Sequence, residues 1–438
     1  MTPPPHAPQS TQPLRIGIAG LGTVGSGVMR LLNENAALIA RRAGREIKVT
    51  AVAARDATRD RGIDLGAVRW HEDAVALAHD PDVDAVVEVI GGADGVALAL
   101  AEASLAAGKP FVTANKAMIA AHGMTLAARA EAGDIALKFE AAVAGGIPVI
   151  KALREGASAN RIERVYGILN GTCNFILTAM ESRALSFEAA LVEAQALGYA
   201  EADPGFDIDG VDASHKLAIL AAICFSARTD VAGVTVEGIR AIHAEDIKEA
   251  DALGYRIRLI AMAEMQNGAL LQYVRPCLVA AEHPLGYVPG CLNAVVAEGN
   301  FVGRLFLEGA GAGDGPTASA VVADIIDVAR DEYGPAFTMA VGALDALPRA
   351  DVGHVVGKSY IRLHVADRTG VLAEIAIAMR DAGVSVESLI QRGGMDGEAL
   401  IVLVTHASDA AAVDGALNLL ARGDALVAPP LRLPILAL

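Results

Sequence analysis

The segment from Gly198 to Lys216 concentrates ionisable side chains, and it reads GYAEADPGFDIDGVDASHK. It contains five carboxylates followed by a histidine and a lysine: Glu201, Asp203, Asp207, Asp209, Asp212, His215 and Lys216. Two interpretations are open. The segment is either an acidic surface loop with an ordinary ion pair, or a site for a substrate whose ammonium group needs a carboxylate partner.

The end of this segment predicts a helix that begins after a turn at Asp209-Gly210. Asp212 and Lys216 are four residues apart, so they share one face of that helix. In the functional interpretation Lys216 is a general acid–base whose pKa is lowered by desolvation and tuned by Asp212. His215 points elsewhere on the helix and is expected to be structural.

A second candidate is Glu140, which interrupts the apolar, glycine-bearing run FEAAVAGGIP before a helix expected to begin near Pro148. A carboxylate beside backbone carbonyls suits a hard cation. The alternative is that Glu140 pairs with a neighbouring lysine or with a backbone group.

A glycine turn follows the short apolar strand expected at Leu14–Ala19, and it reads Gly20-Leu-Gly22-Thr23-Val24-Gly25. Gly20 permits the tight turn, Gly22 leaves room for a pyrophosphate, and Gly25 allows the following helix to pack on the strand. The free N–H groups at the start of that helix attract phosphates. The pattern predicts a Rossmann-type dinucleotide-binding domain.

The second strand, expected at 47–54, ends in Arg55-Asp56, where the adenosine ribose should lie. An acidic residue there favours NAD, and an arginine favours NADP. Because Arg55 comes first and Arg59 follows, we expect NADP, with NAD as the alternative. Arg55 could also be an ordinary solvated loop residue.

Two further strands are expected at 85–90 and 111–113, and they end at Gly91 and just before Lys116. The carboxyl ends of such strands line the ligand crevice, so both residues should lie near the cofactor. The alternative is that Lys116 is a solvated surface residue, which is the more common role of a lysine at a strand end.

The run AQALGYAEADPGFDIDGVDASHK, from Ala194 to Lys216, resembles the homoserine dehydrogenase signature at every defined position. Other segments agree in order: GLGTVGSGV, TANKA, EAAVAGGIP, GILNGTCNFIL and GAGAGDGPTASAV. The resemblance covers about 14–330. It implies an oxidoreductase that interconverts L-homoserine and L-aspartate 4-semialdehyde with NAD(P)H, in threonine, methionine and isoleucine biosynthesis.

The resemblance also implies roles for single residues. Lys216 resembles the acid–base lysine, and Lys116 a second lysine at the reacting end. Glu201 resembles the residue that binds the substrate ammonium, with Asp207 and Asp212 completing the pocket. Gly313 would approach the cofactor. The resemblance also implies a site for a monovalent cation, expected to be sodium, formed by Glu140 and the carbonyls of Val143, Gly145 and Ile147.

In the last eighty residues the sequence pattern changes to short strands and helices in alternation. Strands are expected at 360–365, 384–389, 399–405 and 427–434, with helices from about 370 to 382 and from 409 to 420. This βαββαβ order is ferredoxin-like. The turn DRTGVL and the following IAIAMRDAGVSVESL resemble an ACT domain, which implies feedback control, with threonine the obvious effector. The alternative is that this domain only pairs subunits.

We therefore expect an α/β chain with four parts: a disordered tail at 1–13, an NAD(P)-binding domain at 14–147 with a returning segment at about 309–345, a mixed α/β substrate and dimerisation domain at 148–308, and an ACT domain at 357–438. The family implies a homo-oligomer, either dimer or tetramer. The net charge of −16 argues against nucleic acid, and no apolar run is long enough to span a membrane. Four scattered cysteines suit a reducing cytoplasm.

Two alternatives compete with this function. One is another NAD(P) oxidoreductase that acts on an amino-acid semialdehyde by acylation, which would need a reactive cysteine; Cys173 has no obvious base nearby in sequence. The other is an amino-acid sensor with an inactive dehydrogenase domain. Such a sensor would be expected to have lost Lys216 or the glycine turn, and both are present.

Overall fold

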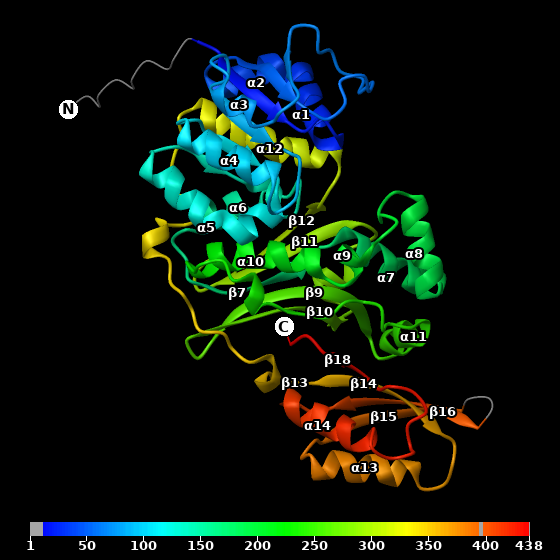
Figure 1. The fold of residues 1–438 in the computed structure, drawn as a ribbon. Coiled ribbons are helices and arrows are strands. Elements are labelled where there is room, and N and C mark those ends of the chain that lie inside the picture. Colours follow the sequence, from blue (N-terminus) through cyan, green and yellow to red (C-terminus); the bar gives the residue numbers. More distant parts are fainter. Residues whose placement is uncertain (1–11, 394–396, 438) are drawn as a thin grey trace. The chain divides into compact units, whose positions relative to one another are not determined.

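A computed structural model describes residues 12–393 and 397–437 (Figure 1). The tail expected at 1–13 falls almost wholly on residues 1–11, outside the described residues. The chain forms two compact units. One holds Met1–Leu169, His215–Gly233 and Asn293–Leu347, and the other holds Asn170–Ser214, Val234–Leu292 and Pro348–Leu438. Among the described residues, no helix is long and apolar enough to cross a membrane.

The first unit contains a six-stranded sheet in the order β3-β2-β1-β4-β5-β6, with all strands parallel. This order confirms the Rossmann-type domain. The strands are β1 (Leu14–Ala19), β2 (Ile47–Ala53), β3 (Arg69–His71), β4 (Ala85–Glu88), β5 (Phe111–Thr113) and β6 (Leu137–Lys138). The helices are α1 (Thr23–Glu34), α2 (Ala36–Ala43), α3 (Ala76–His79), α4 (Val96–Ala106) and α5 (Lys116–Ala132).

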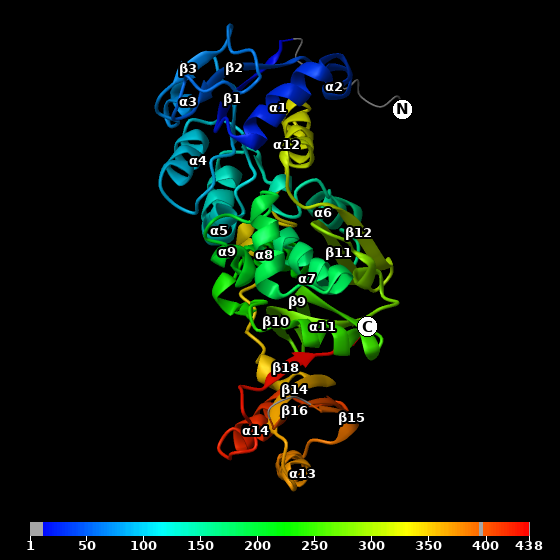
Figure 2. The same ribbon diagram turned by 90° about the vertical axis from the view of Figure 1, so that its right-hand side faces the viewer.

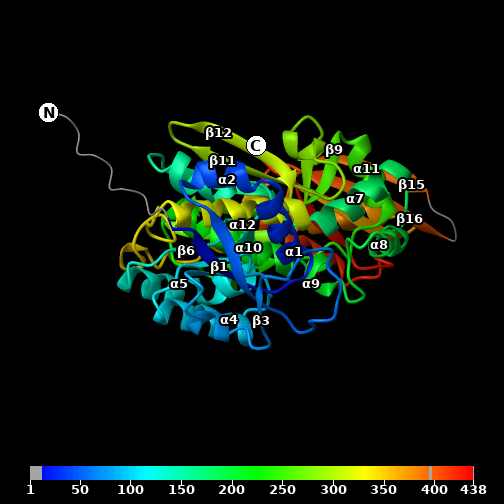
Figure 3. The same ribbon diagram turned by 90° about the horizontal axis from the view of Figure 1, so that it is seen from above.

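Helix α12 (Asp314–Ala329) returns to this sheet late in the chain and lies beside α1 (Figures 2 and 3). The contact is close because Gly27 of α1 has no side chain where the Asp314 carbonyl approaches. Apolar residues of β1, α1 and α12 share one buried core, which includes Ile16, Val28 and Val321. Burial of this apolar surface stabilises the domain in which the glycine turn sits.

Three sequence expectations for strand ends need correction. The strand expected at 384–389 is β15, which covers Val386–Gly393. Strand β4 stops at Glu88 and not at Ile90, because the Glu88 carboxylate accepts the N–H groups of Ile90 and Gly91 and draws them out of the ladder. The last strand, β18, covers Leu431–Pro434 and not the longer 427–434. Pro429 and Pro430 interrupt it, because proline has no N–H to donate.

The remaining strands of the first unit are β7 (Ile162–Ile168), β11 (Leu292–Gly299) and β12 (Gly303–Ala310), in the order β12-β11-β7. Helix α6 (Val149–Lys151) continues into a π-helical turn at Ala152–Gly156. In the second unit, β9 (Tyr255–Gln266) pairs antiparallel with β10 (Ala269–Ala280), and β8 (Thr235–Val236) pairs parallel with β10. The mixed sheet expected after the first domain is thus confirmed.

Between β7 and β9 the chain forms five helices: α7 (Gly171–Arg183), α8 (Phe187–Ala196), α9 (Gly205–Ile208), α10 (Val211–Phe225) and α11 (Ala244–Ala252). Helix α10 is the helix predicted after the Asp209-Gly210 turn. The edge of β10 pairs with three separate segments in series: at Leu270 with Arg349, at Tyr273–Val274 with β8, and at Leu278 with Ile435.

The last part of the second unit is a four-stranded antiparallel sheet in the order β15-β16-β14-β18. The strands and helices are β14 (Ser359–Ala366), α13 (Val371–Asp381), β15 (Val386–Gly393), β16 (Glu398–Thr405), α14 (Ala410–Leu420) and β18. Both helices lie on one face of the sheet (Figure 1) and share a buried core with it. The expected ferredoxin-like fold is confirmed.

Candidate active site

The glycine turn has the geometry that a dinucleotide needs. Gly20 has a φ of +99°, which favours glycine, and a side chain on Gly25 would lie 2.0 Å from the Gly20 carbonyl oxygen. A side chain on Gly22, by contrast, would meet nothing within 4 Å. Helix α1 begins at Thr23 with no side-chain cap, so Thr23, Val24 and their neighbours present uncapped N–H groups.

A groove of about 440 Å³ opens beside this turn. Gly20, Gly22, Arg55 and Arg59 line it, so the structure brings these sequence-predicted residues together. Arg55 and Arg59 are exposed. The Asp56 carboxylate accepts bonds from the N–H and hydroxyl of Thr58, which lowers the pKa of Asp56.

Arg61 is a groove residue that sequence reasoning missed. Its guanidinium donates to the carbonyls of Leu21, Asp56 and Arg59 and stacks over Trp70. Arg61 therefore fixes the loop that carries Arg55 and Arg59. The presence of arginines at both ends of the loop 55–61 is the one sequence signal that could have suggested this role for Arg61.

Glu88 and Asn115 organise the strand ends where Gly91 and Lys116 lie. The buried Glu88 carboxylate accepts the Gly91 N–H at 3.0 Å and the Thr113 hydroxyl at 2.6 Å. The Asn115 side chain caps α5 and donates to the Gly92 carbonyl. Lys116, half-buried, is the first residue of α5. Sequence reasoning missed Glu88, although a carboxylate at a buried strand end is a recognisable signal.

Asp207 and Asp212 are held together by Asn170, which sequence reasoning did not single out. The Asn170 amide nitrogen donates to Asp207 at 2.8 Å and to Asp212 at 2.9 Å, while its oxygen caps α7. The hydroxyl of Thr172 also contacts Asp207, at 3.3 Å. Two carboxylates are thus brought together by one amide. Glu201 is exposed on the preceding loop, where its carbonyl accepts from Gln195.

Lys216 lies on α10, and its side chain is buried, with 7% of the residue exposed. Its ammonium nitrogen donates to the Leu169 carbonyl at 2.7 Å. Leu169 directly precedes Asn170 in the chain. Burial of an amine in contact with a neutral carbonyl is the setting that desolvates a lysine.

The carboxylate of Glu140 is buried and accepts the N–H groups of Ile150 and Lys151, at 2.9 and 2.8 Å. It therefore engages backbone groups, which is the alternative left open above. Burial, together with the Asp324 carboxylate, raises the pKa of Glu140 to about 7. Lys151 pairs with Asp327 at 2.6 Å.

The cysteines give no support to acylation chemistry. Cys173 is buried on α7, and its thiol donates to the Asp207 carbonyl at 3.2 Å. Burial also raises the pKa of the Cys277 thiol to about 12. A thiol of this kind is a poor nucleophile because it stays protonated.

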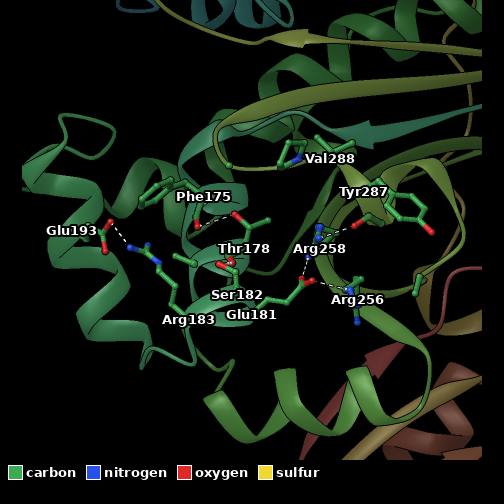
Figure 4. A pocket seen from close by; sticks show the side chains of 15 residues that line it. Phe175, Thr178, Glu181, Ser182, Arg183, Glu193, Arg256, Arg258, Tyr287 and Val288 are labelled. Atoms are coloured by element: carbon green, nitrogen blue, oxygen red, sulfur yellow. Dashed lines mark hydrogen bonds and ion pairs between the residues drawn. The ribbon is translucent and has the colours of Figure 1, made fainter.

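A separate cavity of about 570 Å³ in the second unit lies between α7 and the loop before β11 (Figure 4). None of the residues predicted from sequence lines it. Its charged groups pair with one another: Glu181 with Arg256 and Arg258, and Arg183 with Glu193. Among the described residues that line this cavity, each charged side chain therefore has a partner of opposite charge.

Comparisons with known proteins agree along the chain. Residues 20–140 match the family model described as "Homoserine dehydrogenase, NAD binding domain", residues 148–326 match "Homoserine dehydrogenase", and residues 359–421 match "ACT domain". The chain is 43% identical to the homoserine dehydrogenase of Pseudomonas aeruginosa over 403 residues, which cover 90% of this chain and 92% of the relative. It is 38% identical to that of Bacillus subtilis, covering 90% and 91%.

Solved structures extend the likeness to the fold. A homoserine dehydrogenase from Thiobacillus denitrificans is 40% identical, with a TM-score of 0.92 over 98% of this chain and 99% of that one. The S. aureus enzyme at pH 7.5 is 31% identical, with a TM-score of 0.75 over 97% and 99%. With its glycine turn, its carboxylate pair and its buried lysine in the matched segments, the chain belongs to the homoserine dehydrogenase family.

Proposed function

We propose that the chain interconverts L-homoserine and L-aspartate 4-semialdehyde with Lys216 as the acid–base. The observation that carries this is the buried Lys216 ammonium, 2.7 Å from the Leu169 carbonyl. When bound, the nicotinamide supplies the hydride. As an aldehyde is reduced its oxygen becomes negative, and the Lys216 ammonium stabilises that charge and then gives up a proton.

The other residues orient the substrate. Glu201 binds the ammonium group, and Asp207 and Asp212 complete the pocket, with Asn170 positioning both carboxylates through its amide. Lys116 acts as the second lysine at the reacting end.

The test is NADP-linked oxidation of L-homoserine by the purified chain, followed as absorbance of the reduced cofactor. Turnover supports the proposal. Binding of NADP and of an amino acid without turnover would favour the sensor alternative. Turnover of another amino-acid alcohol in preference to homoserine would favour a different dehydrogenase.

We propose NADP as the preferred cofactor. Arg55 and Arg59 are exposed on the groove, whereas the Asp56 carboxylate is engaged by Thr58. An exposed guanidinium suits a 2′-phosphate. A hyperthermophilic archaeal homoserine dehydrogenase solved in complex with NADPH is 27% identical, with a TM-score of 0.62 over 72% of this chain. Gly313, with a φ of +113° at the start of α12, would approach the cofactor.

Replacing Arg55 by alanine should lower kcat/KM for NADP about tenfold and leave that for NAD nearly unchanged, because only NADP carries the phosphate. Steady-state kinetics with both cofactors measure the ratio. Arg41→Ala, which removes an exposed arginine from α2, is the matched control. An unchanged ratio in Arg55→Ala would contradict the assignment.

The implied sodium ion would be held by the carbonyls of Val143, Gly145 and Ile147 beside Glu140. A buried polar group nearby fits such an ion. Asn293 is 1% exposed, and neither polar atom of its amide has a hydrogen-bond partner in the described part of the chain. Its oxygen occupies the space beside Gly311, whose carbonyl packs on Gly145. A buried unpaired amide costs about 1–3 kcal/mol, which a bound cation or water would offset.

We propose that the ACT domain binds threonine and inhibits the enzyme. The turn before α13 holds Gly370 at a φ of +99° and presents the exposed Asp367. Millimolar L-threonine should reduce homoserine oxidation several-fold, and Asp367→Ala should weaken that inhibition, since an amino-acid ammonium needs a carboxylate. D-threonine is the control. If L-threonine neither inhibits nor binds in calorimetry, pairing of subunits remains as the role of this domain.

We also propose a homo-oligomer in a reducing cytoplasm. The turn before β12 and the strand itself present exposed apolar side chains, including Phe301 and Phe306, on an edge strand. Such a patch on an edge suits a second copy of the chain. All four cysteines are free thiols, which agrees with that compartment.

A further inference from the structure

Three side chains of types that can ligate a metal ion converge at the N-terminal end of α11. His243 and Glu245 come from that end of the helix, and His364 comes from β14 of the ACT domain. One ligand atom from each lies within 4.8 Å of the others. The His364 Nε2 is 2.7 Å and the His243 Nδ1 is 3.5 Å from the same Glu245 oxygen. No residue of this cluster takes part in the proposed catalytic reaction.

The surroundings carry an excess of negative charge. Below the cluster, the buried Asp246 accepts bonds from Tyr360 and Arg362, and Glu249 pairs with Arg392. With Glu245, this network holds three carboxylates against the guanidinium groups of Arg362 and Arg392. One negative charge is left when both histidines are neutral.

Arg362 is the strongest competitor for Glu245, since its guanidinium lies 3.5 Å from the same oxygen. However, Arg362 is buried and bound to Asp246. The imidazoles are accessible, with 56% of the His243 side chain and 25% of the His364 side chain exposed. An ion can therefore reach the histidines from solvent without displacing the arginine from Asp246.

We propose that His243, Glu245 and His364 bind a divalent transition-metal ion of the zinc type. Two imidazole nitrogens and one carboxylate oxygen are a recognised donor set for zinc, with a fourth position left to water. Bonds of about 2.0–2.1 Å need ligand atoms slightly more than 3 Å apart, which the 3.5 Å spacing nearly provides. A plain hydrogen bond accounts for the His364–Glu245 contact. His243 is the N-cap residue of α11 and forms a capping box with Asp246, and its Nδ1 also lies beside the Glu245 carboxylate.

The ion would connect α11 to β14, two elements that are 119 residues apart in sequence at the Glu245–His364 contact. It would replace a proton on each histidine that is protonated in the free state, so binding should weaken in acid. Because the ion would contact both α11 and β14, its binding would strengthen the attachment of the ACT domain to α11.

The test is titration of the chelator-treated full chain with Co²⁺, read as visible absorption, followed by displacement with Zn²⁺. We expect one tetrahedral Co²⁺ band per chain, and His364→Gln and Glu245→Gln should each weaken Co²⁺ binding more than about 100-fold. His406→Gln, on an exposed histidine of the same domain, should bind like the wild type. Thermal unfolding checks that each variant is folded. No band in the wild type, or equal affinity in folded His364→Gln, would overturn the proposal.

Discussion

Replacing Lys216 by alanine is expected to lower kcat for homoserine oxidation by about a thousand-fold or more. The substitution removes both the group that moves the proton and the charge that stabilises the developing alkoxide. The loss should fall on kcat, with the Kd for NADP unchanged, since Lys216 is outside the cofactor groove. Steady-state kinetics and fluorescence titration of the cofactor measure the two quantities.

Two controls separate chemistry from folding in this experiment. Lys48→Ala removes an exposed lysine, 57% of whose side chain is accessible, and should leave kcat unchanged. Lys216→Arg keeps the positive charge but cannot transfer a proton near neutral pH, so it should be nearly as inactive as alanine. Equal rates in wild type and Lys216→Ala would remove the assignment of the acid–base.

The second large effect is expected at the glycine turn, where two neighbouring glycines should respond differently. Gly22 has an extended backbone with a φ of −78°, and a side chain there would meet nothing within 4 Å. Serine is a better helix cap than glycine. Gly22→Ser should therefore keep the melting temperature, while its side chain fills the space of the pyrophosphate and weakens NADP binding about 100-fold, or about 2.7 kcal/mol.

Gly25→Ala should instead damage the fold. Its new carbon would lie 2.0 Å from the Gly20 carbonyl oxygen, so helix and strand must move apart. We expect a loss of about 3 kcal/mol in the free energy of unfolding, and cofactor binding should fail as a consequence. Denaturant unfolding and cofactor titration of both variants test the distinction. A destabilised Gly22→Ser, or a fully stable Gly25→Ala, would contradict it.

Local patterns predicted the elements that depend on nearby residues. The glycine turn, strand β1 and helix α10 follow from spacing and apolar periodicity within about twenty residues. The same holds for the ACT fold, whose strands and helices alternate clearly. The predicted ends of β4 and β18 were wrong for local reasons. The Glu88 carboxylate accepts backbone N–H groups just after β4, and Pro429 and Pro430 precede β18.

The polar contacts that assemble the candidate site could not be predicted in this way. Asn170 meets carboxylates 37 and 42 residues further along the chain. Glu88 meets Thr113 across two strands, 25 residues away. Such pairs depend on how elements that are distant in sequence pack together, and a single sequence does not show that packing. The contacts of Glu140 were equally out of reach, because the backbone N–H groups that its carboxylate accepts lie 10 and 11 residues further along the chain.

The serial pairing along the edge of β10 has a practical consequence for experiments. The segment entering the ACT domain bonds to Leu270, and the segment leaving it bonds to Leu278. Deleting everything after Leu347 would strip both segments and leave backbone donors and acceptors of a long strand uncovered, which invites edge-to-edge aggregation. A truncated enzyme that precipitates would then be mistaken for one that needs the ACT domain for activity. Point substitutions such as Asp367→Ala avoid this confusion, because they leave the strand edge covered.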